Sequence, residues 1–469
     1  MTIQGFGPWI LCLGLTGLAV AQPAGQDARA LAAFQTTMER DGFTVKPGAT
    51  IALNFVSLWC AGTPIPGYDG AMYSNNQQYL QLLVPKSAQD STPVNPFQMG
   101  ATEAVVLIGL TPPPERYFAF QPFLRNKAMP DGSRKTLWTT LGDSVSNATI
   151  KTTGSAPFNK PMALIFTPDE RTDARVRKAL ERAGYPAAII NTAVFPASML
   201  NLGHGNAADD FTVVLRNALW EKESDGEAYI QNPPLHLFRV TPPAETAANP
   251  FPAPELRVRG TGQGEMDLMN KLGQLREGII KANPGLYVKD YRTQSAGYEG
   301  YDYLQRGVDP WGDSRDAFFL VGGYMPEYQS NDEITLDSGE FLMIYGANHV
   351  ATGKGTYHNF NVYESKVGKV PLGSADDRTF AGTASRYLPQ DPAAAKLLYA
   401  YKVARDCNGE NNCVTLGIEN CSRVTVGKDT VLGMIFRVYL EPATKVGAAM
   451  PEVLYDRVMK FSPRPPVQP

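Results

Sequence analysis

The chain repeats an ordered series of short sequence patterns, and this repetition constrains its fold more than any other feature. Residues 103–109 (EAVVLIG) and 340–346 (EFLMIYG) each hold a glutamate, five apolar or aromatic residues and a glycine. Further along, residues 116–123 (RYFAFQPF) resemble 356–363 (TYHNFNVY). A series of similar blocks in one order is the signature of a repeated structural unit. We therefore predict an internal duplication.

The predicted duplication extends in both directions from these blocks. Three more pairs keep the same order: 27–40 with 265–278, 74–85 with 312–323, and 209–219 with 429–440. The last pair places Arg216 opposite Arg437. Arginine on a strand usually covers β-sheet surface with its aliphatic stem, so we assign Arg437 no chemistry.

Strand-like and helix-like segments interleave in each half. Helical periodicity is present in 173–183 and 266–279. Strand patterns cover 104–108, 117–123, 162–167, 188–195, 211–219 and 235–240. Since these elements lack the regular alternation of a doubly wound sheet, the predicted fold class is α+β: two similar mixed α/β domains in tandem, with β-rich cores and short helices.

The repeat and the composition together predict the segment boundaries. Residues 241–256 carry five prolines and no sustained periodicity, which is typical of an extended connector. The predicted segments are a signal peptide (1–21), a first repeat domain (22–240), a Pro/Ala-rich linker (241–256), a second repeat domain that bears the site (257–461) and a Pro-rich tail (462–469).

The N-terminus has the pattern of a signal peptide. Residues 9–18 are apolar, and Ala19, Val20 and Ala21 form a small-x-small cleavage signature. No Lys or Arg precedes the apolar run, so a buried N-terminal helix is the alternative. No later segment stays apolar over the roughly 18 residues that a membrane span needs. We predict a secreted or periplasmic protein with no membrane span after cleavage.

Cysteine usage agrees with export. Removal of the leader leaves four cysteines, Cys60, Cys407, Cys413 and Cys421, which allow three pairings. A short disulfide within 407–413 (CNGENNC) would close a polar turn and leave Cys60 with Cys421. No pair has the two-to-four-residue spacing of a structural zinc knuckle. Asn147 and Asn420 lie in N-x-Ser/Thr sequons, so a eukaryotic host would make a glycoprotein.

Charge and missing motifs exclude several classes of protein. Lys plus Arg total 43 and Asp plus Glu total 46, a balance of −3 that argues against a nucleic-acid partner. No G-x-S-x-G elbow, phosphate-binding G-x-x-x-x-G-K-S/T loop or H-E-x-x-H zinc helix is present. The glycine run at 259–264 (RGTGQG) follows the linker and reads as a turn leading into a helix. The sequence contains no motif that identifies a cofactor.

The segment 345–363 concentrates polar and titratable side chains, among them Asn348, His349, Lys354, Tyr357 and His358. Histidine titrates near neutral pH, so His349 and His358 are candidate acid/base catalysts. Lys354, between two glycines, is a candidate catalytic residue that stabilises negative charge. Asn348 and Tyr357 are candidate substrate-binding residues.

Comparison of the halves favours a site in the second one. The first half has Phe118 opposite His358 and no counterpart of His349. The alternative is a surface hairpin, or a strand with one of Tyr357 and His358 in the core and the other in solvent. As a metal pair the two histidines need a third ligand, for which Glu340, Asp313 and Asp316 are the candidates.

A second candidate segment is 305–319, which is dense in charge for this chain. Asp313 and Asp316 could act as catalytic carboxylates or orient a histidine, with Arg315 and Trp311 as substrate-binding residues. The alternative is a loop whose Arg–Asp pairs neutralise each other. If the strands align as predicted, this loop approaches 345–358.

These sequence features are consistent with two alternative functions. The first is a secreted or periplasmic enzyme that hydrolyses, cleaves or isomerises an organic small molecule or carbohydrate. It would use acid/base chemistry in its second domain, with metal-assisted chemistry as the secondary option. The second is a non-catalytic exported protein that binds a carbohydrate or apolar small molecule in an aromatic-lined cleft between the repeats. The sequence sets neither the substrate nor the oligomeric state.

Overall fold

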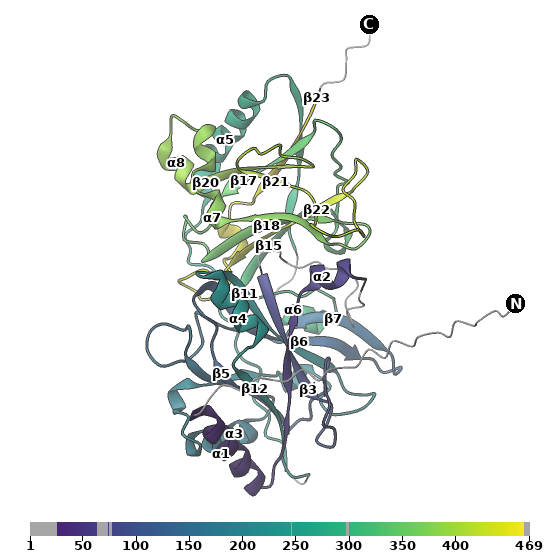
Figure 1. The fold of residues 1–469 in the computed structure, drawn as a ribbon, viewed down its shortest axis with the longest axis vertical. Helices are drawn as coiled ribbons and strands as arrows, with labels where there is room; N and C mark the ends of the chain where they lie inside the picture. Colours follow the sequence, from purple (N-terminus) through teal and green to yellow (C-terminus); the bar gives the residue numbers. More distant parts are fainter. Residues whose placement is uncertain (1–25, 63–73, 75–76, 245, 297–299, 464–469) are drawn as a thin grey trace, which may run out of the picture.

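The computed structural model describes residues 26–62, 74, 77–244, 246–296 and 300–463. The predicted signal peptide (1–21) lies outside these residues, as does 464–469 of the predicted tail. The described part is sheet-rich, with four β-sheets stacked along the long axis of the molecule and short helices at both ends (Figure 1). None of its helices combines the length and the apolar character that crossing a bilayer requires.

The first half of the chain builds two of these sheets. Its outer sheet has the order β1 (Thr44–Pro47), β12 (Leu235–Thr241), β5 (Ala104–Leu110), β9 (Pro161–Thr167), β10 (Ile190–Val194). Its inner sheet has the order β2 (Ala49–Leu53), β3 (Gln77–Pro85), β11 (Asp210–Trp220), β6 (Glu115–Ala128), β7 (Arg134–Thr140), with β4 (Pro93–Val94) on β3 and β8 (Val145–Ser146) on β6.

The second half builds the other two. Its outer sheet has the order β13 (Leu286–Tyr291), β23 (Arg457–Pro463), β17 (Phe341–Ala347), β20 (Leu398–Ala404), β21 (Cys413–Thr415). Its inner sheet has the order β14 (Thr293–Ser295), β15 (Ala317–Met325), β22 (Leu432–Tyr439), β18 (Tyr357–Glu364), β19 (Pro371–Asp376), with β16 (Ser330–Asn331) on β15.

Helices cover the outer sheets at the two ends of the molecule (Figure 1). One end carries α1 (Gln26–Arg40) and α3 (Glu170–Arg182), and the other α5 (Met269–Ala282) and α8 (Pro392–Leu397). The shorter helices are α2 (Phe55–Cys60), α4 (Glu223–Gln231), α6 (Tyr301–Arg306) and α7 (Asp377–Phe380). Short 3-10 turns are η1 (Ala187–Ile189), η2 (Ala197–Met199), η3 (Met266–Leu268), η4 (Pro326–Tyr328), η5 (Thr383–Arg386) and η6 (Met450–Glu452).

The strand orders of the two halves correspond. In each outer sheet the last two strands, β9/β10 and β20/β21, run parallel and the others antiparallel. The five similar sequence blocks lie on corresponding elements, for example β6 with β18 and β11 with β22. Register agrees as well, because Arg216 pairs with Ala119 and Arg437 pairs with Asn359.

Side-chain alternation explains the layering. Along β6, Phe118 and Phe120 pack into the core between the inner and outer sheets of the first half. Tyr117 points the other way and packs against Tyr357 and Tyr439 of the opposite inner sheet. Successive residues of a strand face opposite sides, so each inner sheet is covered on both faces.

This double covering corrects one expectation. The alternative to a site in this segment was that one of Tyr357 and His358 lies in the core and the other in solvent, or that the histidines lie on a surface hairpin. Tyr357, His358 and His349 are all fully buried. The reason is that β18 lies in an inner sheet, where neither face meets solvent.

The halves are also joined outside the sheets. The disulfide Cys60–Cys421 links α2 of the first half to a loop of the second half, and Cys407–Cys413 closes the predicted polar turn. Both predicted pairings are confirmed. Beside the first, Arg423 donates to the carbonyl of Trp59 at 2.7 Å and stacks over its ring.

We expect the two disulfides to differ in their contribution to stability. Cys60–Cys421 closes a sequence separation of 361 residues and Cys407–Cys413 one of 6. Removing the first by Cys60→Ala/Cys421→Ala should cost roughly 3–5 kcal/mol, and removing the second about 2 kcal/mol, because the longer loop constrains the unfolded chain more. Denaturant midpoints of the two double variants would compare them, and equal midpoints would contradict the expectation.

Candidate functional site between the two inner sheets

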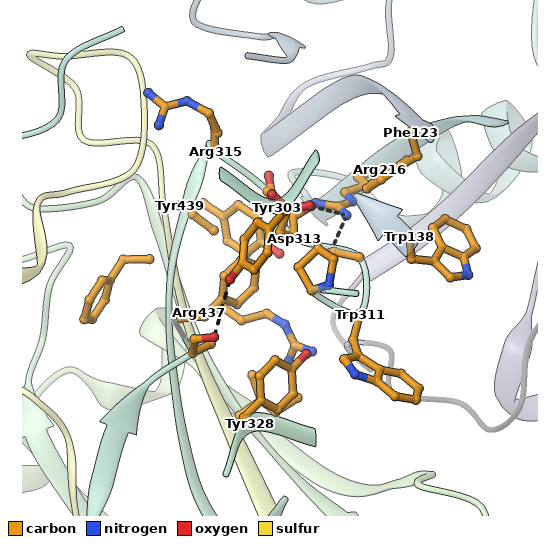
Figure 2. A pocket seen from close by; sticks show the side chains of 18 of the residues that line it. Phe123, Trp138, Arg216, Tyr303, Trp311, Asp313, Arg315, Tyr328, Arg437 and Tyr439 are labelled. Atoms are coloured by element: carbon orange, nitrogen blue, oxygen red, sulfur yellow. Dashed lines mark hydrogen bonds between the residues drawn. The ribbon is translucent and has the colours of Figure 1, made fainter. Parts of the chain in front are cut away.

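A cavity of about 390 Å³ lies between the inner sheets of the two halves (Figure 2). Its walls come from β3, β6 and β11 on one side and from β15 and β22 on the other. The segment 309–315, which includes the predicted Trp311, Asp313 and Arg315, also lines it. The cavity is therefore built by both halves and by part of a predicted site segment.

Two arginines in corresponding positions enter the cavity from the two halves. Arg216 on β11 donates from Nη2 to the carbonyls of Gly312 and Asp313 at 3.2 and 3.3 Å. Arg437 on β22 donates from Nη2 to the Tyr363 hydroxyl at 3.0 Å. Each side chain is almost wholly buried. Burying a charge is costly unless polar groups surround it, and here phenolic oxygens and carbonyls do so.

Both guanidinium groups stay charged despite their burial. Burial works against the charged form of Arg216, but Tyr439, Tyr117 and Tyr79 outweigh it and raise its pKa above the usual value. Burial likewise opposes charge on Arg437, whose pKa is raised by the surrounding tyrosines. The arginines therefore present permanent positive charge to the cavity.

The lining is positive although the chain is slightly negative. Its arginines are Arg125, Arg216, Arg259, Arg315 and Arg437. Its carboxylates are Asp309 and Asp313. Nη1 of Arg216 has no hydrogen-bond partner among the described residues, so it has donors to spare for a ligand. An anion is the partner that such donors favour.

Aromatic rings form much of the remaining wall, including Phe123, Trp138, Tyr303, Trp311 and Tyr328 (Figure 2). Trp138 and Trp311 have positive φ values of 30° and 56°, a backbone conformation that bulky residues rarely adopt. Gly312 N donates to the Trp138 carbonyl at 2.9 Å, which ties the two segments together. Backbone strain of this kind concentrates at ligand-binding sites.

Asp313 is a carboxyl in the cavity lining whose pKa is shifted toward neutral pH. Its carboxylate accepts from Thr140 N at 2.8 Å and from Thr140 Oγ1 at 2.9 Å. Burial raises its pKa from 3.8 to about 6, against the opposing effects of Thr140, Arg216 and Arg259. The group can therefore change charge near neutral pH.

The other charged residues of this predicted segment hold the two halves together. Arg315 Nε binds Asp143 at 2.7 Å across the interface. Asp316 accepts from the Tyr117 hydroxyl at 3.0 Å and from Ser144. Asp316 does not line the cavity. These ion-pair and hydrogen-bond contacts join the segment to the first half, whereas the alternative interpretation expected Arg–Asp pairs within the loop.

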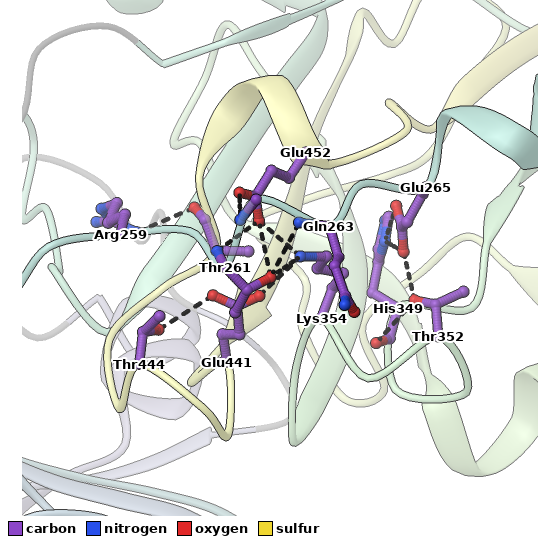
Figure 3. A network of polar contacts seen from close by, with 12 residues as sticks. Arg259, Thr261, Gln263, Glu265, His349, Thr352, Lys354, Glu441, Thr444 and Glu452 are labelled. Atoms are coloured by element: carbon purple, nitrogen blue, oxygen red, sulfur yellow. Dashed lines mark hydrogen bonds and ion pairs between the residues drawn. The ribbon is translucent and has the colours of Figure 1, made fainter.

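Lys354 lies in a different polar network, shown in Figure 3. Its Nζ lies 2.8 Å from Glu441 and 2.6 Å from Glu452. Burial lowers the pKa of Lys354, but these carboxylates outweigh burial and raise it. The glycine run at 259–264 binds the Glu452 carboxylate through its backbone, since Thr261 N and Gly262 N both donate to Glu452. This run serves as a turn before η3, as predicted.

The remaining predicted residues are buried in the second half. Among the described cavity-lining residues, none is Asn348, His349, Lys354, Tyr357 or His358. The 345–358 and 309–316 segments lie at the same end of the inner sheet, because Tyr439 pairs with both Ala317 and Tyr357. Strand β22 lies between these two segments. Their proximity therefore does not bring the candidate catalytic side chains of one segment against those of the other.

Sequence reasoning placed Arg216 opposite Arg437 and assigned Arg437 no role. The overlooked signal was a buried-strand pattern with one arginine in each half, VVLRNAL and MIFRVYL. A charged residue inside an apolar run that is covered on both faces is costly, so its presence in both halves points to a purpose beyond surface coverage.

Comparison with known proteins gives no family. No protein-family model matches, and no curated protein matches. Among solved structures, the tandem CBM22 domains of Xyn10C from Paenibacillus barcinonensis share 7% identity, with 82% of this chain and 87% of that chain covered and a TM-score of 0.15. A truncated AlyQ with CBM32 and alginate lyase domains shares 10% identity, with 90% and 92% covered and a TM-score of 0.15. Scores this low carry no argument about fold or function.

Asp313 should make stability depend on pH in a defined window. Its pKa is higher in the folded protein than its usual 3.8, so its stabilising contribution is complete below pH 3.8 and is lost as pH rises through about 6. Asp313→Asn keeps the size and cannot ionise. We expect the stability of the variant relative to the native chain to increase between pH 4 and 7, measured by urea unfolding. A constant difference would show that the carboxyl titrates normally.

Proposed function

We propose that the cavity between the inner sheets binds a small organic anion that carries an aromatic or sugar ring. The single observation that carries this proposal is the buried Arg216 guanidinium, whose Nη1 is without a described partner in a cavity lined by arginine and aromatic side chains. Guanidinium groups recognise carboxylate, sulfate and phosphate oxygens, and aromatic walls stack on flat rings or sugar faces.

The size of the cavity supports a small ligand. A volume of about 390 Å³ lies within the usual 300–1,000 Å³ range of small-molecule sites. This proposal develops the predicted aromatic-lined cleft between the repeats, with one change: the ligand is charged rather than neutral or apolar. The reason is the excess of arginine over carboxylate in the lining.

Catalysis is a second candidate function, and Asp313 is the observation that favours it. A cavity carboxyl with a pKa of about 6 is suited to act as a general acid or base near neutral pH. Hydrolysis, cleavage or isomerisation in this cavity would use Asp313, with Trp311 and Arg315 beside it. Acid/base catalysis by His349, His358 and Lys354 stays a prediction, and their burial away from the cavity offers it no support.

Two further inferences complete the proposal. We infer that the two halves arose by tandem duplication, which the corresponding strand orders and registers support. We also infer export from the cell, since the leader-like N-terminus and two disulfides are both expected of a protein folded in an oxidising compartment.

Binding should depend on both central arginines. A panel of aromatic carboxylates, uronic acids and sulfated sugars, each with a neutral counterpart, would be screened by thermal shift and measured by calorimetry. We expect Arg216→Met and Arg437→Met each to weaken binding of an anionic hit by about 10- to 100-fold, because each removes a charged hydrogen-bond donor. Arg276→Met is the matched control, since Arg276 is only partly buried and pairs with Asp290 on the outer side of the second half, away from the cavity lining. Equal losses in all three variants, or a preference for the neutral counterparts, would refute the proposal.

Ligands found in this screen can also be used to distinguish simple binding from catalysis. Asp313→Asn should bind an anionic ligand at least as tightly as the native chain at pH 7, because it removes a negative charge from the cavity. If the native chain converts a hit and Asp313→Asn binds it without conversion, the protein is an enzyme that uses Asp313. If neither converts any hit, simple binding is the function.

A further inference from the structure

A second polar cluster lies deep in the second half, between its inner and outer sheets. His349 follows β17, His358 is on β18, and Asp456 immediately precedes β23. All three side chains are fully buried. Nε2 of His349, both ring nitrogens of His358 and Oδ2 of Asp456 have no hydrogen-bond partner among the described residues. Four unsatisfied polar atoms together in a core are costly unless something binds them.

The distances within this cluster suit a shared ion better than hydrogen bonds. Nε2 of His349 lies 3.6 Å from Oδ2 of Asp456, and Nε2 of His358 lies 3.7 Å from Oδ1. Both separations exceed a hydrogen bond. Ligands at 2.0–2.1 Å from a tetrahedral zinc ion lie ~3.3 Å apart. Both histidine–aspartate distances are within a few tenths of an ångström of this value, and the ligand atoms of all three residues lie within 4.8 Å of one another. The two imidazole rings are adjacent, with centroids 4.5 Å apart.

A surrounding set of hydrogen bonds already orients two of these residues. Nδ1 of His349 contacts both Glu265 oxygens, at 2.9 and 3.0 Å (Figure 3). The other ring nitrogen, Nε2, therefore lies on the side of Asp456. Glu265 is itself fixed by Thr352 and by Leu454 N. The Tyr399 hydroxyl donates to Oδ1 of Asp456 at 2.6 Å. Histidine ligands of metals are held in this way, by a carboxylate on the second ring nitrogen.

The first half shows that the fold does not require polar groups here. There Phe118 occupies the position of His358. Gly109 pairs with Met162 and Leu235. Its counterpart Gly346 pairs with Tyr399, and a Cβ at 346 would lie 2.5 Å from Asp456.

Phe118, Met162 and Leu235 all belong to the hydrophobic core of the first half. The second half thus carries histidine, tyrosine and aspartate at positions that the first half fills with apolar side chains. An apolar core is the less costly solution at a buried position, so the substitution needs a compensating interaction.

We propose that His349, His358 and Asp456 form a binding site for a divalent transition-metal ion, with zinc as the first ion to test. Two imidazoles and one carboxylate are a common donor set for zinc and its neighbours in the first transition series. The third ligand that sequence reasoning sought in Glu340, Asp313 or Asp316 is Asp456. Those three carboxylates bind elsewhere: Glu340 with Lys460, Asp313 with Thr140 and Asp316 with Tyr117.

The ion would be structural rather than catalytic. The three ligands come from segments on the two sheets of the second half, so one ion would join these sheets at their shared core. None of the three lines the cavity between the halves. The site is therefore independent of the anion-binding proposal, and either one stands if the other fails.

A proton is the competing occupant. Burial lowers the pKa of His349, yet the Glu265 and Asp456 carboxylates outweigh burial and raise it to about 10, so an imidazolium between them would also balance charge. It would leave both nitrogens of His358 without a partner, whereas an ion would engage one of them. The experiment must therefore separate a metal from a proton.

The test measures metal in the full-length mature protein and in matched variants. Cells would be grown with ZnCl₂ and, separately, with CoCl₂, and the protein purified without chelator. Elemental mass spectrometry should find stoichiometric zinc in the native chain, and the cobalt form should show a visible absorption band. Asp456→Asn and His358→Phe should retain at least about tenfold less metal, and Glu265→Gln should bind it more weakly.

His204→Gln is the control, because His204 is a partly exposed histidine that pairs with Glu103 in the first half. It should retain native metal content. Native protein without zinc or cobalt from either culture would overturn the proposal and favour the proton. Equal metal in the native chain and in a folded Asp456→Asn would also overturn it. If both ligand variants fail to fold, the cobalt spectrum of the native chain decides, since imidazole coordination shifts it from that of aqueous cobalt.

Discussion

Two guanidinium groups buried between the inner sheets determine how the halves of this molecule fit together. Moving an ion out of water costs several kcal/mol, so Arg216 and Arg437 are tolerated only where oxygen atoms surround them. The inner faces supply these as tyrosine hydroxyls and loop carbonyls. Arg216 of the first half depends on the second half for these oxygens, because the Gly312 and Asp313 carbonyls accept its hydrogen bonds. Arg437 finds its acceptor, the Tyr363 hydroxyl, on the neighbouring strand of its own sheet.

The same requirement explains why the interface is not simply a hydrophobic seam. Strand alternation sends Phe118 and Phe120 into the core of their own half and leaves Tyr117 for the partner half. Each half thus has an apolar core of its own and an inner face that combines apolar side chains with buried polar groups. Arg315 and Asp143 add an ion pair across the contact that is almost fully buried on the arginine side. Polar contacts and apolar packing therefore act together in joining the halves.

Local structure was readable from the sequence because it depends on short-range patterns. The helix expected over 173–183 is α3 (Glu170–Arg182), and the strands expected over 211–219 and 235–240 are β11 and β12. The short spacing of Cys407 and Cys413 favoured one of the three possible cysteine pairings, and the structure has that pairing. The mixed, sheet-rich character of the fold followed from the irregular order of these elements.

The sites were harder to find because they depend on which faces are covered. Strand periodicity shows that Tyr357 and His358 face opposite sides, but it cannot show that a second sheet covers each side. For this reason a buried cluster resembled a surface loop. Asp456 and Glu265 lie far from His349 in the sequence, and no spacing rule connects them. By contrast, Arg216 and Arg437 were aligned correctly, and only the cost of burying them would have marked them as important.

The covalent link that α2 and the Cys60–Cys421 disulfide form between the halves bears on how a ligand could reach the central cavity. Helix α2 belongs to the first half, yet Cys60 is covalently joined to the second half, and Trp59 packs where a side chain on Gly368 would collide with it. The cross-link therefore limits how far the two halves can separate at this point. Exchange of a ligand in the proposed site would then depend on local movement of side chains that line the cavity and reach solvent, such as Trp311, which is 39% exposed.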